Sequence, residues 1–288
     1  MSKRVVLLTD LDNTLYDFVG YFAPCFRAML HALSRILALS EEALLSEFRT
    51  VYERRGTVEY AFSVQELASV RRLVPRAQDE AVHVARVAFG QTRRKRLRLY
   101  RGVLETLRWI NGAGGRLCAI TNAPAYHAYM RLRHLGIEGL FDVMGAWEGV
   151  LVPQEYQEAG QRYLRKYREM DGRLDLSIRA DKGLIKPSPS MVEEVCQYLS
   201  DPRAVFFVVG DSVRKDLAPC RSLDITTIWA KYGQRTDEKD QATLDSITPW
   251  TKEEFALHYD AEFEPDYTIG SFEELRDILP IPYQQRLL

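Results

Sequence analysis

The chain has 288 residues, of which 46% are hydrophobic and 27% are charged, and this composition is ordinary for a folded globular protein. A chain of this length can bury a sizeable core, either as one large domain or as a core with a smaller partner. The 39 Lys and Arg residues balance the 40 Asp and Glu residues, for a formal net charge of −1. This balance argues against a global attraction for nucleic acid or an anionic membrane, so local groups have to hold any anionic ligand.

The four cysteines form no C-x-x-C pair, which argues against a zinc knuckle or a thioredoxin-type site. Cys118 and Cys196 lie in apolar patterns typical of core residues, and free thiols are typical of the cytosol. The apolar run Val5–Leu8 is too short for a signal peptide, and Ala204–Val209 is far too short to span a membrane. We therefore expect a soluble cytoplasmic protein.

The first predicted element is a strand at Val5–Leu8, where a short apolar run of β-branched and Leu residues stops at polar residues. The pattern then changes, because apolar residues recur at intervals of three and four in segments such as Phe22–Leu39 and Glu42–Tyr52. Pro75 is expected to separate two helices. We predict an all-helical insert over residues 16–99.

From Gly102 onwards, strand and helix signals alternate along the chain. The predicted strands are Leu117–Ile120, Leu140–Met144, Val205–Val209, Ile225–Trp229 and Tyr267–Ile269. The predicted helices are Val103–Ile110, Tyr126–Leu135, Pro189–Leu199 with Ser188 as its cap, and a last helix that opens at Ser271 with a capping-box pattern. This alternation predicts a parallel sheet with helices on both faces.

Polar residues directly follow three of the predicted strands, at Asp10, Thr121 and Asp211. The carboxyl ends of parallel strands meet at one edge of a sheet, so these side chains are expected to lie close together. Asp12 lies two residues after Asp10, and both carboxylates can face one pocket if the chain turns there. Taken alone, each of these residues is also compatible with an ordinary strand end or solvated loop.

Two further motifs complete the set, because Lys186 precedes Pro187 and Asp216 follows Asp211 by five residues. In this order, Asp-x-Asp-x-Thr, then Thr, then Lys-Pro, then Gly-Asp-x-x-x-x-Asp resembles the haloacid dehalogenase-like (HAD) superfamily. The resemblance implies an α/β fold with a Rossmannoid parallel sheet core and helices on both faces. It places this core in residues 1–15 and 100–288, and a smaller all-helical cap domain of the first type in residues 16–99.

The resemblance also implies roles for the motif residues. Asp10 would be the nucleophile that forms an aspartyl-phosphate, and Asp12 would act as acid and then as base. Mg²⁺ would be held by Asp10, Asp211, the backbone carbonyl of Asp12, and Asp216 either directly or through water.

Thr121 and backbone N–H groups near Asn122 and Ala123 would hold phosphoryl oxygens. Lys186 would pair with Asp10 and with the phosphate, which offsets the repulsion between these two anions. Dehalogenases of the superfamily lack an acid at the position of Asp12, because a halide leaves without a proton, so Asp12 favours phosphate chemistry. P-type pumps of the superfamily are excluded because the sequence has no membrane span.

These roles predict a magnesium-dependent hydrolase of a small phosphomonoester, with a small phosphorylated metabolite as its partner rather than a nucleic acid polymer or a membrane. The segment Asp12–Tyr16 is similar to the opening of several nucleotidase-like members, which favours a nucleotide or sugar phosphate. Two alternatives stay open, namely a phosphotransferase or phosphomutase on the same core, and a non-catalytic binding module.

The substrate-reading residues of the cap stay open as well. His31, His83 and Arg86 are candidates, although each is also typical of a solvated surface, and Arg93–Arg96 is either a solvated helix face or an anion-attracting rim. Two segments are long for the family plan, 147–183 and 231–266. Their aromatic residues are more typical of packing on the core or of a partner surface than of base binding: Tyr156, Tyr163, Tyr167, Trp250, Phe255 and Tyr259.

Overall fold

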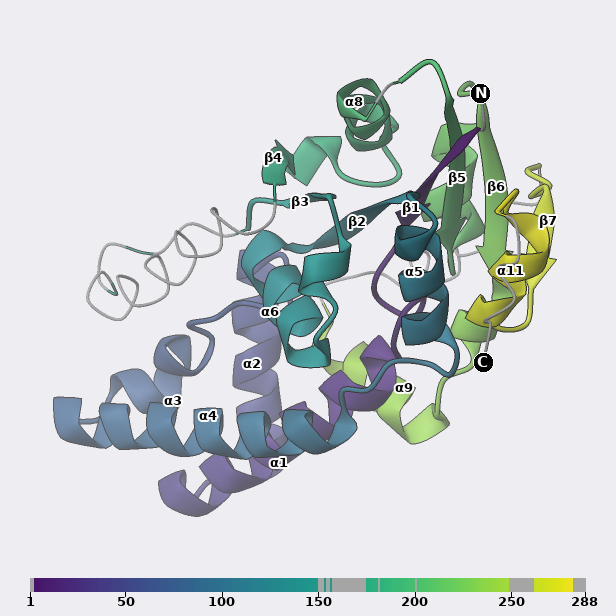
Figure 1. Cartoon of the computed structure of the whole chain (residues 1–288). Coiled ribbons are helices and arrows are strands. Elements are labelled where there is room, and N and C mark those ends of the chain that lie inside the picture. The colour runs from purple at the N-terminus through teal and green to yellow at the C-terminus, as the bar shows by residue number, and fades with distance from the viewer. Residues whose placement is uncertain are drawn as a thin grey trace.

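The computed structural model describes residues 3–149, 153, 156, 182–199, 201–248 and 262–281, and the backbone of 175–180. Its centre is a sheet of seven strands in the order β4-β3-β2-β1-β5-β6-β7, and every neighbouring pair is parallel (Figure 1). The strands are β1 (Arg4–Thr9), β2 (Arg116–Pro124), β3 (Val143–Trp147), β4 (Asp175–Ala180), β5 (Ala204–Gly210), β6 (Ile225–Ala230) and β7 (Tyr267–Ile269). The predicted α/β fold is confirmed.

The central strand β1 forms because its side chains are apolar on both faces. Val5 and Leu7 pack into one hydrophobic cluster, while Val6 and Leu8 pack into a second cluster on the opposite face. Alternation along a strand sends successive side chains to opposite faces, so both faces of this sheet must be covered by other elements. β5 and β2 flank β1, which places the ends of these three strands side by side.

Helices cover both faces of the sheet. α5 (Val103–Gly112) and α6 (Ala125–Leu135) contribute buried side chains to the first cluster, and α8 (Ser190–Tyr198) contributes to the second. The predicted helices at Val103–Ile110 and Tyr126–Leu135 are confirmed almost to the residue. The short α11 (Leu275–Ile278) follows the predicted capping-box segment.

The first four helices after β1 lie together to one side of the sheet (Figure 1). They are α1 (Phe18–Leu37), α2 (Glu41–Arg55), α3 (Ala68–Arg71) and α4 (Pro75–Arg96). α1 and α4 pack against each other, for example through the rings of Phe22 and Phe89, whose centroids lie 5.8 Å apart. The helical character of the insert and the break before Pro75 are confirmed, while the division into cap and core stays a prediction.

One helix from the C-terminal half joins these four. α9 (Glu238–Ile247) packs against α1 and α2, and the Arg27 guanidinium donates to an Asp240 carboxylate oxygen at 2.6 Å. The segment 231–266, which is long for the family plan, therefore supplies a contact with the helical insert. Trp250, Phe255 and Tyr259 of that segment lie outside the described residues.

Three sequence predictions need correction. The strand predicted at Leu140–Met144 is instead Val143–Trp147, because Glu138–Leu140 forms a 3₁₀ turn. Gly145 and Ala146 are weak strand formers, but pairing with β2 on one side and β4 on the other holds them extended. The strand β4 was not predicted, although Leu176, Ile178 and Ala180 alternate there. The N-cap of α8 is Pro189 rather than Ser188, and the helix begins at Ser190.

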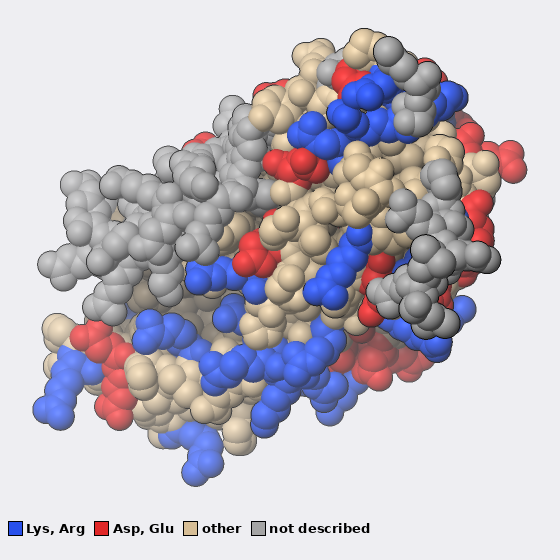
Figure 2. Space-filling view, viewed as in Figure 1, with Lys and Arg blue, Asp and Glu red and all other residues tan. Residues whose placement is uncertain are grey.

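The surface of the helical insert bears on other expectations. Basic side chains gather along α4 in Figure 2, and Arg94, Lys95 and Arg96 are exposed in its last turn, where positive charge complements the helix dipole. His83 and Arg86 are exposed on the same helix.

Three further findings concern His31, the length of the helices and the cysteines. The His31 side chain is 65% exposed and pairs with Glu41. No single helix in the described part of the chain is long and apolar enough to cross a membrane. All four cysteines are free, and Cys25, Cys118 and Cys220 are buried.

Candidate functional site

The loop after β1 carries the first two carboxylates of the candidate site. The Asp10 N–H donates to the Val209 carbonyl of β5 at 2.9 Å, so the sheet ladder continues to the residue that starts the loop. Asn13 adopts a left-handed conformation with φ of 58°, and its N–H donates to the Tyr16 carbonyl at 2.8 Å. This tight turn brings the Thr14 hydroxyl to 3.3 Å from Asp10 Oδ2, which fixes the Asp10 carboxylate at the end of the strand.

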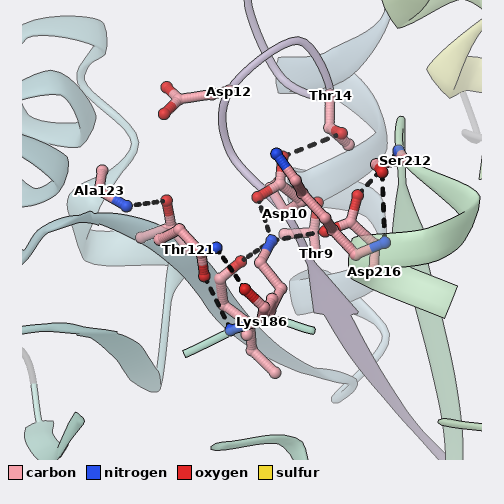
Figure 3. A network of polar contacts seen from close by, with 12 residues as sticks. Thr9, Asp10, Asp12, Thr14, Thr121, Ala123, Lys186, Ser212 and Asp216 are labelled. Carbon is pink, nitrogen blue, oxygen red and sulfur yellow. Dashed lines mark hydrogen bonds and ion pairs between the residues drawn. The ribbon is translucent and has the colours of Figure 1, made fainter. Parts of the chain in front are cut away.

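Lys186 reaches the same point from the loop before α8. Its Nζ donates to Asp10 Oδ1 at 2.5 Å and to Asp216 Oδ1 at 2.6 Å, and also to the Ile120 carbonyl at 3.0 Å (Figure 3). The Lys186 side chain is 5% exposed. The three donor positions of the ammonium are therefore used in full, and burial makes these ionic contacts stronger than they would be in water.

The Asn122 side chain joins the end of β2 to the Lys186 loop. Its amide donates to the Lys186 carbonyl at 2.7 Å, and its Oδ1 accepts from the Lys186 N–H at 2.9 Å. These two bonds fasten the Lys186 loop to the end of β2. The predicted phosphate contact at this residue therefore concerns its backbone N–H, because the side chain is already paired.

Thr121, on β2, is the next residue of the site. Its hydroxyl accepts from the Ala123 N–H at 3.1 Å, and the side chain is buried near Lys186 (Figure 3). The hydroxyl proton is still available to a ligand, because that bond uses only an acceptor position.

The loop after β5 supplies the last two carboxylates, Asp211 and Asp216. The Ser212 N–H donates to Asp216 Oδ2 at 2.9 Å, which turns that side chain back toward the strand end. A Cβ atom on Gly210 would lie 2.4 Å from the Asp216 side chain, so only glycine permits this approach. The Asp211 carbonyl accepts from the Trp229 indole at 2.9 Å, which anchors the loop to β6.

Asp10, Asp211 and Asp216 form a cluster in which one carboxylate oxygen of each lies within 4.8 Å of the others. All three residues are buried, and Lys186 is the cation in contact with Asp10 and Asp216. Burial raises the pKa of Asp10 to about 7, and burial together with the neighbouring Asp216 and Asp10 raises the pKa of Asp211 well above its usual range. Three desolvated oxygen donors with one compensating charge fit a hard divalent cation such as Mg²⁺.

The Asp12 side chain points away from this cluster, although it lies only two residues from Asp10 (Figure 3). The Tyr16 hydroxyl donates to Asp12 Oδ1 at 2.6 Å, and Arg131 Nη2 donates to Asp12 Oδ2 at 3.3 Å. Burial raises the pKa of the Asp12 carboxyl above its usual range, although the Arg131 charge opposes this rise.

Sequence analysis did not single out Arg131, which lies on α6 with a side chain only 4% exposed. Its guanidinium also donates to the Glu59 carboxylate and to the Tyr21 hydroxyl, the latter at 3.1 Å. Burial acts to lower the pKa of Arg131, but the charges of Asp12 and Glu59 outweigh this effect and keep it charged. The available signal was its position three residues after Ala128, on the buried face of the helix.

The fold and the site define a class of α/β proteins with a parallel sheet, in which a carboxylate-rich sheet edge lies beside a helical insert. A model of the haloacid dehalogenase-like hydrolases matches residues 5–170, and a related HAD-hydrolase-like model matches residues 184–275. The chain therefore belongs to the haloacid dehalogenase-like hydrolase family, and the family resemblance inferred from its motifs is confirmed.

Two relatives are phosphatases, which agrees with the branch predicted from Asp12. A glyceraldehyde 3-phosphate phosphatase of Methanopyrus kandleri is 24% identical over 82% of this chain and 87% of its own length. A phosphoglycolate phosphatase of Nitrosococcus oceani is 21% identical over 86% of this chain and 95% of its own.

Two solved structures share the fold. A HAD phosphatase from Thermococcus onnurineus has a TM-score of 0.53 at 19% identity and covers 98% of this chain and 99% of its own. A HAD hydrolase of Bacillus subtilis, solved with bound magnesium, has a TM-score of 0.51 at 17% identity and covers 98% of this chain and 100% of its own.

Proposed function

We propose that this protein hydrolyses small phosphomonoesters with Mg²⁺ through an aspartyl-phosphate on Asp10. The observation that carries the proposal is the buried cluster of Asp10, Asp211 and Asp216 around the Lys186 ammonium. Burying these carboxylates costs free energy of folding, because each of them loses its hydration. A purely structural role does not explain why the protein keeps such a cluster. Family membership supports the same chemistry.

In the first step, an Asp10 oxygen forms a bond to phosphorus while the bond from phosphorus to the ester oxygen breaks. Asp12 gives its proton to that departing oxygen, so the alcohol leaves as a neutral molecule. In the second step, water attacks the phosphorus and passes a proton to Asp12. The bond between Asp10 and phosphorus then breaks, which releases inorganic phosphate and returns both carboxyl groups to their starting states.

Electrostatic support comes from groups around the phosphoryl position. Lys186 neutralises Asp10 while that carboxylate approaches an anionic phosphate. The Thr121 hydroxyl and the backbone N–H groups of Asn122 and Ala123 hold phosphoryl oxygens. Asp10, Asp211, Asp216 and the Asp12 carbonyl would hold Mg²⁺, which supplies further charge neutralisation when bound.

The proposed substrate class agrees with the substrates after which the two relatives are named. We infer a small phosphorylated metabolite, such as a nucleotide or sugar phosphate, rather than a nucleic acid polymer or a membrane lipid. The two relatives are named for glyceraldehyde 3-phosphate and phosphoglycolate, which are both small. Residues 16–99 would act as the cap that closes over the sheet edge and selects among such esters.

The experiment is a phosphate-release screen over a broad panel of metabolites with Mg²⁺, run with and without acceptor alcohols. We expect release of free phosphate from at least one small phosphomonoester, and none with Asp10→Asn. Asp245→Asn is a matched control, because Asp245 is an exposed residue of α9 whose carboxylate pairs with Gln241 and is not part of the cluster. Transfer to an acceptor without free phosphate would replace hydrolysis by a phosphotransferase reaction, and no turnover of any ester would remove the proposed function.

A further inference from the structure

One guanidinium connects Asp12 with the helical insert. Arg131 contacts Asp12 through Nη2 and the Glu59 carboxylate through Nη1, and its side chain is 4% exposed. It also lies over the rings of Phe18 and Tyr16, with its carbon 5.5 and 5.9 Å from their centroids. These contacts fix the guanidinium in a single place between two acids.

Glu59 belongs to the segment between α2 and α3, which faces α6. Its side chain is 10% exposed. His127, one helical turn before Arg131, hydrogen-bonds the backbone of Glu59. The same residue of the insert is thus held by two residues of α6, through its backbone and through its carboxylate. Glu59 also lines a small cavity between the segment 57–62 and the start of α6.

The positive charges next to Asp12 are already paired with other acids. Arg131 is neutralised by Glu59 whether or not Asp12 carries a proton. Lys186 is the other cation that acts on Asp12, but its ammonium is bound by Asp10 and Asp216. The two cations that act on Asp12, Arg131 and Lys186, are therefore both paired with other carboxylates. A third carboxylate placed here would lose its hydration without gaining an ionic partner.

The leaving group of the ester has to lie against this cluster, because Asp12 must touch the departing oxygen to protonate it. We propose that Asp12, Arg131 and Glu59 form a charge filter that selects phosphomonoesters whose leaving group carries no negative charge. The proposal rests on the proposed function and specifies its substrate class. Esters whose leaving group carries only hydroxyl or carbonyl groups are hydrolysed, and esters whose leaving group carries a carboxylate are hydrolysed poorly.

The test uses two esters that differ at one carbon. Glyceraldehyde 3-phosphate carries an aldehyde where 3-phosphoglycerate carries a carboxylate, while the phosphate and the middle hydroxyl are the same. The measured quantity is the ratio of kcat/KM for the aldehyde to kcat/KM for the carboxylate. For the wild-type protein we expect a ratio of at least about 10, because an uncompensated like charge at short range costs more than a tenfold change in rate.

Two substitutions should move this ratio in opposite directions. Glu59→Gln keeps the size of the side chain but frees Arg131 to pair with the substrate carboxylate, so the ratio should fall by about tenfold or more. Arg131→Gln removes the cation and leaves the two acids, so the ratio should rise. Glu53→Gln is the matched control, because Glu53 is an exposed acid of α2 that pairs with Arg49, and it should leave the ratio unchanged.

A ratio compares two substrates of one protein preparation, so a general loss of folding or activity cancels. A wild-type ratio at or below 1 would overturn the charge filter even if every substitution failed to fold. An unchanged ratio in Glu59→Gln would overturn the role of Glu59. Hydrolysis of p-nitrophenyl phosphate separates failure of the charge filter from failure of the proposed function. If this ester is turned over while the ratio for the two triose esters is near 1, only the charge filter is removed. Absence of turnover with these three esters and with every ester of the metabolite panel removes the proposed function and the filter with it.

Discussion

Two groups of charged side chains lie close to each other in this protein, and they are built differently. The sheet-edge cluster, formed by Asp10, Lys186, Asp211 and Asp216, comes from loops that follow parallel strands. The cap-contact cluster, formed by Asp12, Arg131 and Glu59, joins that edge to a helix of the core and to the helical insert. The sheet-edge cluster has three acids for one cation, and the cap-contact cluster has two acids for one cation.

The two clusters differ in the groups that compensate the charges of their acids. In the sheet-edge cluster, the Asp211 carboxylate lies beside two other acids, which is the arrangement expected of a site that gains its missing positive charge from a ligand. In the cap-contact cluster, the Arg131 guanidinium donates to both acids, and the Tyr16 hydroxyl donates to Asp12 as well. The first is therefore suited to chemistry with a metal and a phosphate, and the second to holding Asp12 and reading what lies beyond the phosphate.

The largest expected effect comes from removing the nucleophile. Asp10→Asn should lower phosphate release by at least about 10³-fold, because the amide cannot form the acyl-phosphate bond. Steady-state phosphate release is the measurement, and the circular dichroism spectrum checks the fold. Turnover within a few-fold of the wild type would assign the nucleophile to another residue.

Removal of the metal tests whether the three acids of the sheet-edge cluster hold a cation. Turnover should stop in EDTA and return with Mg²⁺, because Asp211 and Asp216 are proposed to hold the ion. Mg²⁺ should also stabilise the folded protein by about 2.7 kcal/mol at a concentration 100 times its Kd, and raise the Tm accordingly. Asp211→Asn should abolish this shift in Tm, whereas the exposed control Asp245→Asn should keep it. Full activity in exhaustively metal-free buffer would contradict the metal site.

The third prediction separates Asp12 from the sheet-edge cluster. Asp12→Ala should reduce kcat/KM on an alkyl phosphate by about 10² to 10⁴-fold, and by much less on p-nitrophenyl phosphate, whose leaving group departs without a proton. The comparison uses kcat/KM because this quantity reports only the steps up to the first irreversible one. Equal losses on both esters would leave Asp12 as a structural carboxylate and require another proton donor.

The smallest effect is expected at Tyr16. Tyr16→Phe removes one hydrogen bond of 2.6 Å to Asp12 but keeps the ring. A hydrogen bond to a charged group contributes about 1.5 to 3 kcal/mol, so kcat/KM on an alkyl phosphate should fall by about 10 to 100-fold, with a weaker loss on p-nitrophenyl phosphate. Tyr267→Phe on the edge strand β7 is the control and should have no effect on either ester. An equal loss on both esters would mean that Tyr16 supports the fold rather than the orientation of Asp12.

The two clusters also differ in how far sequence can predict them. Asp10 and Asp211 follow short apolar runs, and parallel strands bring their ends together, so the sequence pattern predicts that these two residues share one site. Lys186 and Asp216 joined that prediction through the family resemblance. Their assigned roles stay predictions. Arg131 and Glu59 follow no motif, because their meeting depends on how a helical insert packs on α6, and periodicity along a chain does not specify packing between distant elements.

The same reasoning explains the errors in the fold. Predicted boundaries were good where an element had a clear apolar pattern and a clear stop, as in α5 and α6. They failed at β3, where Gly145 and Ala146 are extended only because strands on both sides hold them. They also failed at β4, whose short alternating run lies inside a long segment. Strand formation at such places is set by neighbours rather than by local propensity.

The position of β1 in the middle of the sheet has a consequence for synthesis of the chain. Its two neighbours are encoded far apart, since β2 begins at Arg116 and β5 begins only at Ala204. Until the second neighbour has emerged from the ribosome, one side of β1 is an open edge, and its side chains are apolar on both faces. Open apolar edges are the usual starting points of aggregation, so truncated or stalled chains that end before β5 should require chaperones to stay in solution.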